Sequence, residues 1–262
     1  MSNKNFGYLF GKNYYKGFDY DYKNKSNEKE YLAPFFDKKH KPFLDELANI
    51  PKPNEIDNSC QFDLITRYPG LTLGTGYGHG LSEVVGDFKI GLSFDHTTGL
   101  PIIPGSSLKG ALRAVFPNAK GKNQHKNTSD KVKGAKRAYI KALLDKNQEC
   151  DIDELELEIF EGISPNGLLP MSLRDTFWDA EIVKSNDSGK IFGDDYITPH
   201  PNPLKNPKPI RFLKILPNVV FRFSFELQDG IINKKDKLDL FKQILKDQGI
   251  GAKTNVGYGR LS

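Results

Sequence analysis

The chain has 262 residues, of which 37% are hydrophobic and 27% are charged, so it is long and apolar enough to bury a substantial core. Its two cysteines, Cys60 and Cys150, lie outside any CxxC or Cys/His pattern, which excludes a disulfide scaffold and a zinc module of the usual kinds. No apolar run approaches the about 18 residues of a membrane span, and the first residues do not resemble a signal peptide. We therefore expect a cytoplasmic protein without membrane contact.

The positive charge of the chain is concentrated in patches. The net charge of +5 does not by itself establish a nucleic-acid partner, because charge acts through its local density. Residues 120–146 hold nine basic and two acidic side chains, whereas residues 149–161 hold seven acidic and no basic ones. The first of these segments begins with a lysine-rich loop, and the role of residues 118–147 stays open.

Residues 1–59 form a polar opening that is rich in tyrosine and, later, in proline. Tyrosine rings pack well while keeping a polar tip, so this extension lies either on a neighbouring protein surface or against its own chain. The sequence does not choose between these alternatives.

The next segment predicts strands and a helix. Alternating apolar residues from position 61 indicate a strand, which leads into a glycine-rich stretch at 70–80. A strand pair follows at 88–94 and 100–103. Residues 104–107 (PGSS) supply a helix cap, and apolar spacing predicts a helix over 107–116.

A second helix is expected over 129–144, with an apolar stripe that includes Val132 and Ala135. Lys133, Arg137 and Lys141 fall on roughly the opposite face. This basic stripe either follows a phosphate backbone or is an ordinary solvated face.

The last third of the chain predicts strands at 168–182, 210–216 and 219–227, the last two forming a hairpin across Pro217-Asn218. A final helix over 237–248 is expected to begin after Asp236 and to end at Gly249. A glycine-rich segment closes the chain.

This order of elements predicts an α+β fold of the ferredoxin-like (RRM-like) β-α-β-β-α-β type, with an antiparallel sheet and two helices on one face. The core is expected in two halves, 60–117 and 168–262, of a single domain over 1–262. Residues 1–59 are an extension and residues 118–167 a charged helical insertion.

The start of the first core helix is a candidate phosphate site. A helix start offers unpaired N–H groups and a positive dipole end, and Ser106, Ser107, Lys109 and Arg113 stand beside it. The alternative is a well-capped helix with two solvated cations. The spacing is not that of a Walker loop, which argues against a nucleotide triphosphatase, and we expect no cofactor.

Two glycine-rich loops are candidates for close contact with a sugar-phosphate chain, because glycine lets backbone amides approach a ligand. Tight structural turns are the alternative. The residues of the loops that are candidates for RNA contact are Gly76, Tyr77 and His79 in the first loop and Lys253, Thr254, Asn255, Gly257 and Tyr258 in the second.

Three histidines invite other chemistry. His79 or His96 could act as general acid or base in metal-independent RNA cleavage, although the sequence places no second catalytic group beside either. His200 could belong to a metal site, but the prolines around it favour a stiff connector, and we expect no metal.

Two segments together resemble the RAMP superfamily of CRISPR-associated RNA-binding proteins. They are residues 99–110 (GLPIIPGSSLKG) with Arg113, and residues 249–261 (GIGAKTNVGYGRL). Residues 5–10 (NFGYLF), 68–79 (YPGLTLGTGYGH) and 197–200 (ITPH) narrow the resemblance to the sixth-subunit family of type III-B, or Cmr, effector complexes.

The resemblance implies a non-catalytic backbone subunit that binds guide CRISPR RNA toward its 3′ end, and possible contact with target RNA. Other RAMP subunits would be its partners, and the family motif transfers to the candidate residues of the helix start and of both glycine loops. A RAMP endoribonuclease that uses His79 or His96 is the rival function. No RRM aromatic signature is visible, so contact with phosphates is expected rather than base stacking on the sheet.

Overall fold

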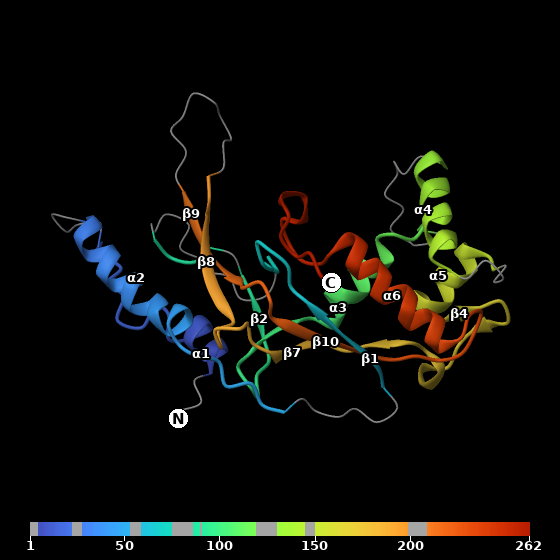
Figure 1. The fold of residues 1–262 in the computed structure, drawn as a ribbon, viewed down its shortest axis with the longest axis horizontal. Helices are drawn as coiled ribbons and strands as arrows, with labels where there is room; N and C mark the ends of the chain where they lie inside the picture. Colours follow the sequence, from blue (N-terminus) through green and yellow to red (C-terminus); the bar gives the residue numbers. More distant parts are fainter. Residues whose placement is uncertain are drawn as a thin grey trace.

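The computed structural model describes residues 5–22, 28–52, 59–74, 86–89, 91–118, 130–144, 150–198 and 209–262. Its centre is an antiparallel sheet (Figure 1). In order across the sheet the strands are β1 (Cys60–Ile65), β10 (Val220–Glu226), β7 (Ala180–Lys184), β3 (Pro101–Ile103) and β2 (Ser93–Phe94), and β6 (Thr176–Phe177) also pairs with β10.

The end of the chain extends this sheet beyond β1. The backbone groups of Ile65 and Ser262 exchange hydrogen bonds of 3.0 Å, and Thr66 and Leu261 form an antiparallel bridge. Helix α3 (Gly105–Arg113) lies between β1 and β7 in the chain, and α6 (Lys234–Gln248) follows β10. The order of terminal segment, β1, β10 and β7 is therefore that of the predicted β-α-β-β-α-β fold, and the predicted fold class is confirmed. The β2–β3 hairpin adds to the free edge of β7.

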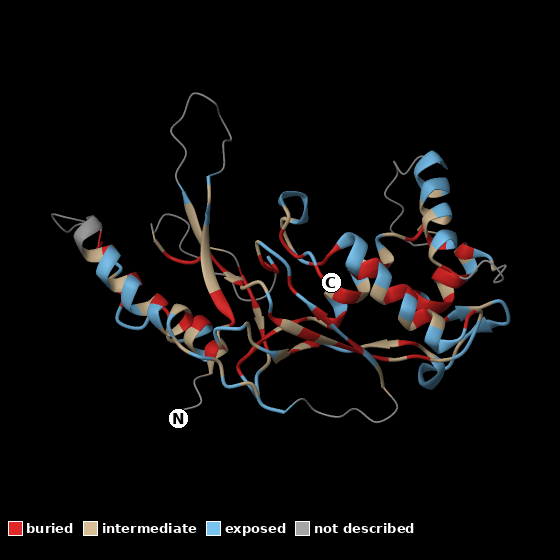
Figure 2. Cartoon of the chain, viewed as in Figure 1, coloured by how far each residue is buried: buried red, intermediate tan, exposed pale blue. Residues whose placement is uncertain are grey.

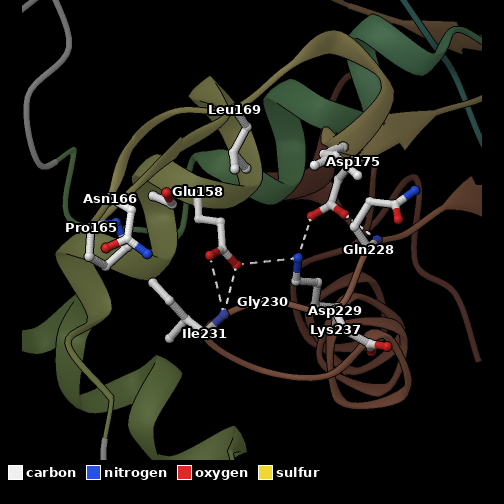
Figure 3. Close-up of a pocket in the computed structure, with 12 residues that line it drawn as sticks. Glu158, Pro165, Asn166, Leu169, Asp175, Gln228, Asp229, Gly230, Ile231 and Lys237 are labelled. Atoms are coloured by element: carbon white, nitrogen blue, oxygen red, sulfur yellow. Dashed lines mark hydrogen bonds and ion pairs between the residues drawn. The ribbon is translucent and has the colours of Figure 1, made fainter.

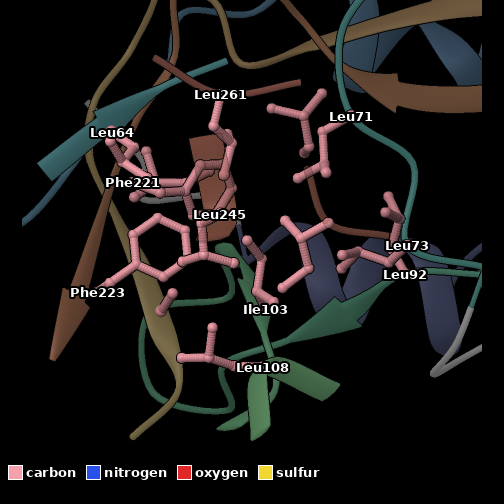
Figure 4. Close-up of a cluster of buried hydrophobic side chains, with 14 of the residues drawn as sticks. Leu64, Leu71, Leu73, Leu92, Ile103, Leu108, Phe221, Phe223, Leu245 and Leu261 are labelled. Carbon is pink, nitrogen blue, oxygen red and sulfur yellow. The ribbon is translucent and has the colours of Figure 1, made fainter. Parts of the chain in front are cut away.

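The core lies between the sheet and these two helices (Figure 4). Phe221 and Phe223 of β10 and Leu64 of β1 are almost fully buried, and they belong to one cluster with Leu108 of α3 and Leu245 of α6. Because side chains alternate along a strand, the buried apolar residues of β1 and β10 in this cluster share the face under the helices.

The opposite face of the sheet carries no helix in Figure 1, and it includes charged side chains. Arg222 of β10 donates two hydrogen bonds, of 2.8 and 3.0 Å, to the carboxylate of Asp63 on β1. Burial, together with Asp95 and Asp179, raises the pKa of Glu181 on β7. That bases do not stack on the sheet stays a prediction.

The caps of the two core helices differ in how well they were predicted. The N-cap of α3 is Pro104, the first of the four residues expected to supply it, and the Gly105 N–H donates to Asp179 Oδ1 at 2.7 Å. The N-cap of α6 is Asn233, not Asp236. These two side chains instead bond reciprocally, because Asn233 accepts from the Asp236 N–H and donates to its carboxylate. Gly249 ends α6 as predicted.

A second hairpin stands away from the central sheet (Figure 1). Strand β8 (Phe192–Ile197) pairs along its whole length with β9 (Ile210–Ile215). The predicted hairpin of residues 210–216 with 219–227 is therefore wrong. Both edges of β10 are already occupied, by β1 on one side and by β7 and β6 on the other, so β9 has no edge of β10 to join.

The N-terminal extension packs against its own chain. It forms α1 (Phe6–Gly11) and α2 (Glu28–Leu44), and its buried side appears as red segments in Figure 2. Tyr14 Oη lies 2.6 Å from His40 Nε2 and accepts the Phe88 N–H at 2.9 Å. The own-chain alternative is thus confirmed for the described part of residues 1–59.

The predicted insertion, residues 118–167, includes α4 (Asp130–Leu143), α5 (Ile152–Glu161) and β4 (Ile163–Ser164). Strand β5 (Gly167–Leu168), which pairs with β4, and a 3₁₀ turn, η2 (Met171–Leu173), lie at and beyond its predicted end. The expected apolar stripe of α4 is partly wrong, because Val132 and Ala135 are exposed and Ile140 is the buried residue. Arg137 of the basic stripe binds Asp153 of α5 at 2.7 and 2.9 Å. Arg137, in the middle of the stripe, is therefore paired with a carboxylate, although its side chain is still 40% exposed.

Candidate nucleic-acid interface

The terminal glycine loop is fixed to the base of the β8–β9 hairpin. The Tyr258 hydroxyl donates to Asp195 Oδ2 at 2.6 Å, and Lys214 Nζ donates to the same oxygen at 2.7 Å. Burial disfavours the Asp195 carboxylate, but these hydrogen bonds outweigh it and hold the pKa of Asp195 below its usual range. Burial and the bond to Asp195 raise the pKa of Tyr258.

The same loop is fixed to the segment that precedes the first glycine loop. The Ala252 N–H donates to the Thr72 carbonyl at 2.7 Å, and the Gly259 N–H donates to the Gly70 carbonyl at 2.8 Å. Leu71 in turn exchanges backbone hydrogen bonds of 2.8 and 2.9 Å with Ile215 of β9. Three distant segments of the chain thus form one rigid support.

Packing explains the glycines of the terminal loop. Gly251 and Gly259 have φ of 99° and 75°, and a Cβ on either would collide with a carbonyl oxygen, that of Thr72 or of Ile250. These glycines make the tight turns that sequence analysis held open as an alternative. Contact with a ligand therefore depends on the side chains between them.

Those side chains reach the surface on a short 3₁₀ turn, η3 (Thr254–Val256). Thr254 and Asn255 are exposed, and Lys253 is half-buried. None of the ion pairs within the described part of the chain involves Lys253. Lys253 also has φ of 63°, a left-handed conformation that costs a non-glycine residue on the order of 1 kcal/mol.

The two remaining candidates in this loop serve the backbone instead. Tyr258 is only 7% exposed and its hydroxyl is bound to Asp195, so it positions the loop. Its hydroxyl is thus already engaged within the protein, and contact of Tyr258 with RNA stays a prediction. Gly257, with φ of 96°, ends the turn. Gly76, Tyr77 and His79 of the first loop lie outside the described residues.

The candidate site on α3 is built differently. Arg113 pairs with Glu161 at 2.6 Å and with Glu156 at 3.5 Å. Lys109 is half-buried, with Nζ 5.4 Å from the centre of the Phe177 ring, and burial lowers the pKa of Lys109. The nearby carboxylates thus offset much of the positive charge that the sequence places here.

Ser106 is exposed and Ser107 half-buried in the first turn of α3. Asp179 already accepts from the first amide of this helix. Among the described residues, no hydrogen bond or ion pair joins the α3 candidates to the terminal loop.

Of the three candidate histidines, only His96 lies among the described residues. His96 is exposed, and the carboxylate of the preceding Asp95 accepts hydrogen bonds from the Thr97 and Thr98 amides at 3.1 and 2.6 Å. His200, like His79, lies outside the described residues. Within the described ranges, no three His, Cys, Asp or Glu side chains gather as a metal site would require.

Arg67, Tyr68 and Arg260 were not among the predicted site residues, although Tyr68 and Arg260 stand in the segments that carry the family resemblance; all three lie beside the terminal loop. The Arg67 N–H donates to the Arg260 carbonyl at 2.9 Å, and all three side chains are exposed. Only the pairing of the chain end with β1 brings them together. No local pattern in the sequence signals that pairing.

A cavity of about 370 Å³ lies where the insertion meets the core (Figure 3). The buried Lys237 Nζ lies 2.8 Å from Asp175 Oδ2 and 3.5 Å from Glu158 Oε1. The Glu158 carboxylate also accepts the Ile231 N–H at 3.0 and 3.2 Å. These charges satisfy one another, so the cluster fixes α5 and β6 to α6.

No helix in the described part of the chain is both long and apolar enough to cross a membrane.

Comparisons with known proteins show what the chain is similar to. The chain is 30% identical over 227 residues to the CRISPR system CMR subunit Cmr6 of Saccharolobus solfataricus. This match covers 84% of this chain and 63% of that relative, so the chain spans less than two thirds of the relative's length. It is similar to a chain in the cryo-EM structure of the type III-B Cmr-beta complex bound to cognate target RNA, with a TM-score of 0.49, 26% identity, and coverage of 78% of this chain and 57% of that one.

The crystal structure of Cmr6 from Pyrococcus furiosus is also similar, with a TM-score of 0.45, 21% identity, and coverage of 78% of this chain and 97% of that one. The family model of the RAMP superfamily matches residues 63–262, which include all strands of the central sheet except the first residues of β1. The chain therefore belongs to the RAMP superfamily.

Proposed function

We propose that this chain is a non-catalytic RNA-binding subunit of a type III-B effector complex. In this proposal the chain binds the guide RNA toward its 3′ end and contacts neighbouring RAMP subunits. Target RNA that pairs with the guide is a further possible contact. Membership in the RAMP superfamily and the similarity to a Cmr6 protein support the assignment.

The observation that carries the proposal is the form of the terminal loop. Its backbone is held by the hairpin base and by residues 70–74, while Lys253, Thr254 and Asn255 extend from a rigid turn. A cation and polar donors on a fixed backbone suit phosphate oxygens, which repeat along RNA whatever its sequence. We expect binding that depends strongly on salt and weakly on base sequence.

The α3 residues Ser106, Ser107 and Lys109 are a second contact in this proposal, with Arg113 bound to Glu161 as their support. Gly76, Tyr77 and His79 are a third, next in the chain to Gly74. Each contact is tested separately by substitution. Removal of a cation that binds a phosphate, such as Lys109, should reduce the magnitude of the slope of log affinity against log salt by about one.

The experiment that tests the proposal is purification of the tagged full chain with its bound molecules. We expect a small RNA with a repeat-derived end, together with larger protein partners. Photo-crosslinking then maps the RNA on the chain. Recovery of the protein partners without RNA adducts on this chain would favour a bridging subunit and contradict the proposal.

Catalysis is tested on the same material. Labelled guide-precursor and target RNA are incubated with the full chain in the absence of metal, alongside His79→Ala and His96→Ala. The proposal predicts uncut RNA in each case. Cleavage by the wild-type chain that either substitution abolishes would establish the rival endoribonuclease function.

A further inference from the structure

Arg67 and Arg260 lie directly opposite each other across an antiparallel strand pair. The bridge between Thr66 and Leu261 sets this register, and the Arg67 N–H donates to the Arg260 carbonyl at 2.9 Å. Directly opposed side chains in such a pair point to the same face, with Cβ atoms about 4.5–5.5 Å apart. Thr66 and Leu261 are buried, so the arginines project from the face away from the helices.

This arrangement opposes the ordinary rule for strand pairs. Like charges directly opposite each other destabilise a sheet. None of the ion pairs among the described residues gives either guanidinium a carboxylate partner. Departures from such local rules concentrate at functional sites, and an anion between the arginines would remove the repulsion.

Tyr68 adds an aromatic ring to this pair. It follows Arg67 directly and is 83% exposed. Pro69, the next residue, rests against the terminal loop, where a Cβ on Gly257 would lie 3.6 Å from Pro69 Cδ. The Tyr68 hydroxyl is close enough to contribute to the raised pKa of Tyr258. The turn that carries Tyr68 is thus part of the rigid support, while its ring stays in solvent.

We infer that Arg67, Tyr68 and Arg260 form a site for one unpaired nucleotide of a single-stranded RNA, with the base stacked on Tyr68 and a phosphate held between the guanidinia. This inference rests on the proposed function and adds a base contact that the phosphate-binding loop does not supply. Every base has a π face, so stacking on Tyr68 tolerates any base.

The geometry fits one nucleotide. Tyr68 is next to Arg67, with Cα atoms about 3.8 Å apart, and it lies in a turn that the Gly70 N–H closes on the Arg67 carbonyl at 2.8 Å, so strand alternation does not apply to its ring. We expect the Tyr68 ring and the Arg67 guanidinium to reach a base and a phosphate of the same or the next nucleotide. The planar fork of arginine matches two oxygens of a phosphate. A protein partner would have to bring carboxylates to this pair, whereas RNA supplies phosphate and base together.

The test measures binding of a single-stranded oligouridine to the full chain, alone and in its assembled complex, with 4-thiouridine crosslinking as a second readout. Tyr68→Leu is expected to weaken binding about 10-fold without changing the salt slope, whereas Tyr68→Phe keeps the ring and near-wild-type affinity. Arg67→Gln and Arg260→Gln should each weaken binding at low salt, and the double variant should reduce the magnitude of the salt slope by about one, because the two arginines share one phosphate. Tyr8→Leu, which removes an exposed tyrosine on α1, and Lys235→Gln, which removes an exposed cation on α6, are the matched controls.

The outcomes separate this inference from the proposed function. If Tyr68→Leu binds as the wild type does while Lys253→Gln weakens binding, the stacking site is wrong and the RNA-binding function stands. If the wild type binds no RNA, alone or assembled, the proposed function fails. If Tyr68→Leu leaves RNA binding intact and instead releases a protein subunit, the surface is a protein interface and the inference is overturned.

Discussion

The Tyr258 hydroxyl lies 2.6 Å from Oδ2 of Asp195, which connects the terminal loop to the first strand of the projecting hairpin. Lys214, on the second strand of the same hairpin, binds that oxygen as well. A movement of the hairpin is therefore coupled to the loop that carries Lys253. We regard this carboxylate as the structural centre of the candidate RNA surface.

Replacing Tyr258 with Phe should loosen this connection without removing a phosphate contact. The lost hydrogen bond is expected to reduce the free energy of unfolding by about 1 kcal/mol. RNA affinity should fall while the salt slope stays the same, because no cation is lost. Thermal unfolding and salt titrations check both. Tyr196→Phe, on an exposed ring of β8, is the control, and a lower salt slope for Tyr258→Phe would refute the positioning role.

The low pKa of Asp195 predicts a specific acid response. Because the folded-state pKa lies below the unfolded value, the carboxylate stabilises the fold above the unfolded pKa of about 3.9. That stabilisation is lost as the pH falls through the folded pKa. The difference in melting temperature between the wild type and Asp195→Asn should be largest near neutral pH and shrink below about pH 4. A difference that is constant across this range would contradict the assignment.

Lys253→Gly separates stability from function. Glycine adopts the left-handed backbone of this position without steric cost, so the variant should be as stable as the wild type or slightly more stable. Its RNA affinity should nevertheless fall at low salt, with a salt slope lower by about one. Calorimetry and salt titration measure the two effects, with Lys235→Gln as the charge control. Unchanged RNA binding would remove Lys253 from the interface.

The buried Lys237 gives a prediction about stability alone. Lys237→Met leaves the carboxylates of Asp175 and Glu158 without their cation, which should cost about 3–5 kcal/mol of unfolding free energy. Burial already raises the pKa of Asp175. The double variant Lys237→Met with Asp175→Leu should recover part of the loss.

Denaturant unfolding measures these differences. Lys235→Met, on the exposed part of the same helix, should change stability by no more than about 0.5 kcal/mol. A Lys237→Met variant as stable as Lys235→Met would show that the buried cluster does not join the insertion to the core.

Local patterns predicted the elements whose burial is set within the segment itself. Alternation around Phe221 and Phe223 located a central strand, and the order of strands and helices was enough for the fold class. The partner of a strand is not a local property. Residues 210–215 lie next to β10 in sequence but pair with 192–197, because the edges of β10 belong to β1, β7 and β6.

The candidate site shows the same limit. Glycine spacing and a cation marked the terminal loop from sequence, but they could not show that Tyr258 turns inward to Asp195. The sequence suggested Arg113 as a cation for RNA, but it could not show that Arg113 forms an ion pair with Glu161 on helix α5. The opposed Arg67 and Arg260 are far apart in the chain, and only the pairing of the terminal segment with β1 makes them neighbours.

The most direct test of the account is a density map of the assembled particle with its RNA. The account predicts nucleotides in contact with Lys253, Thr254 and Asn255, and phosphates near the exposed end of the terminal loop. A map in which these side chains face solvent, with every nucleotide well beyond contact distance, would contradict it.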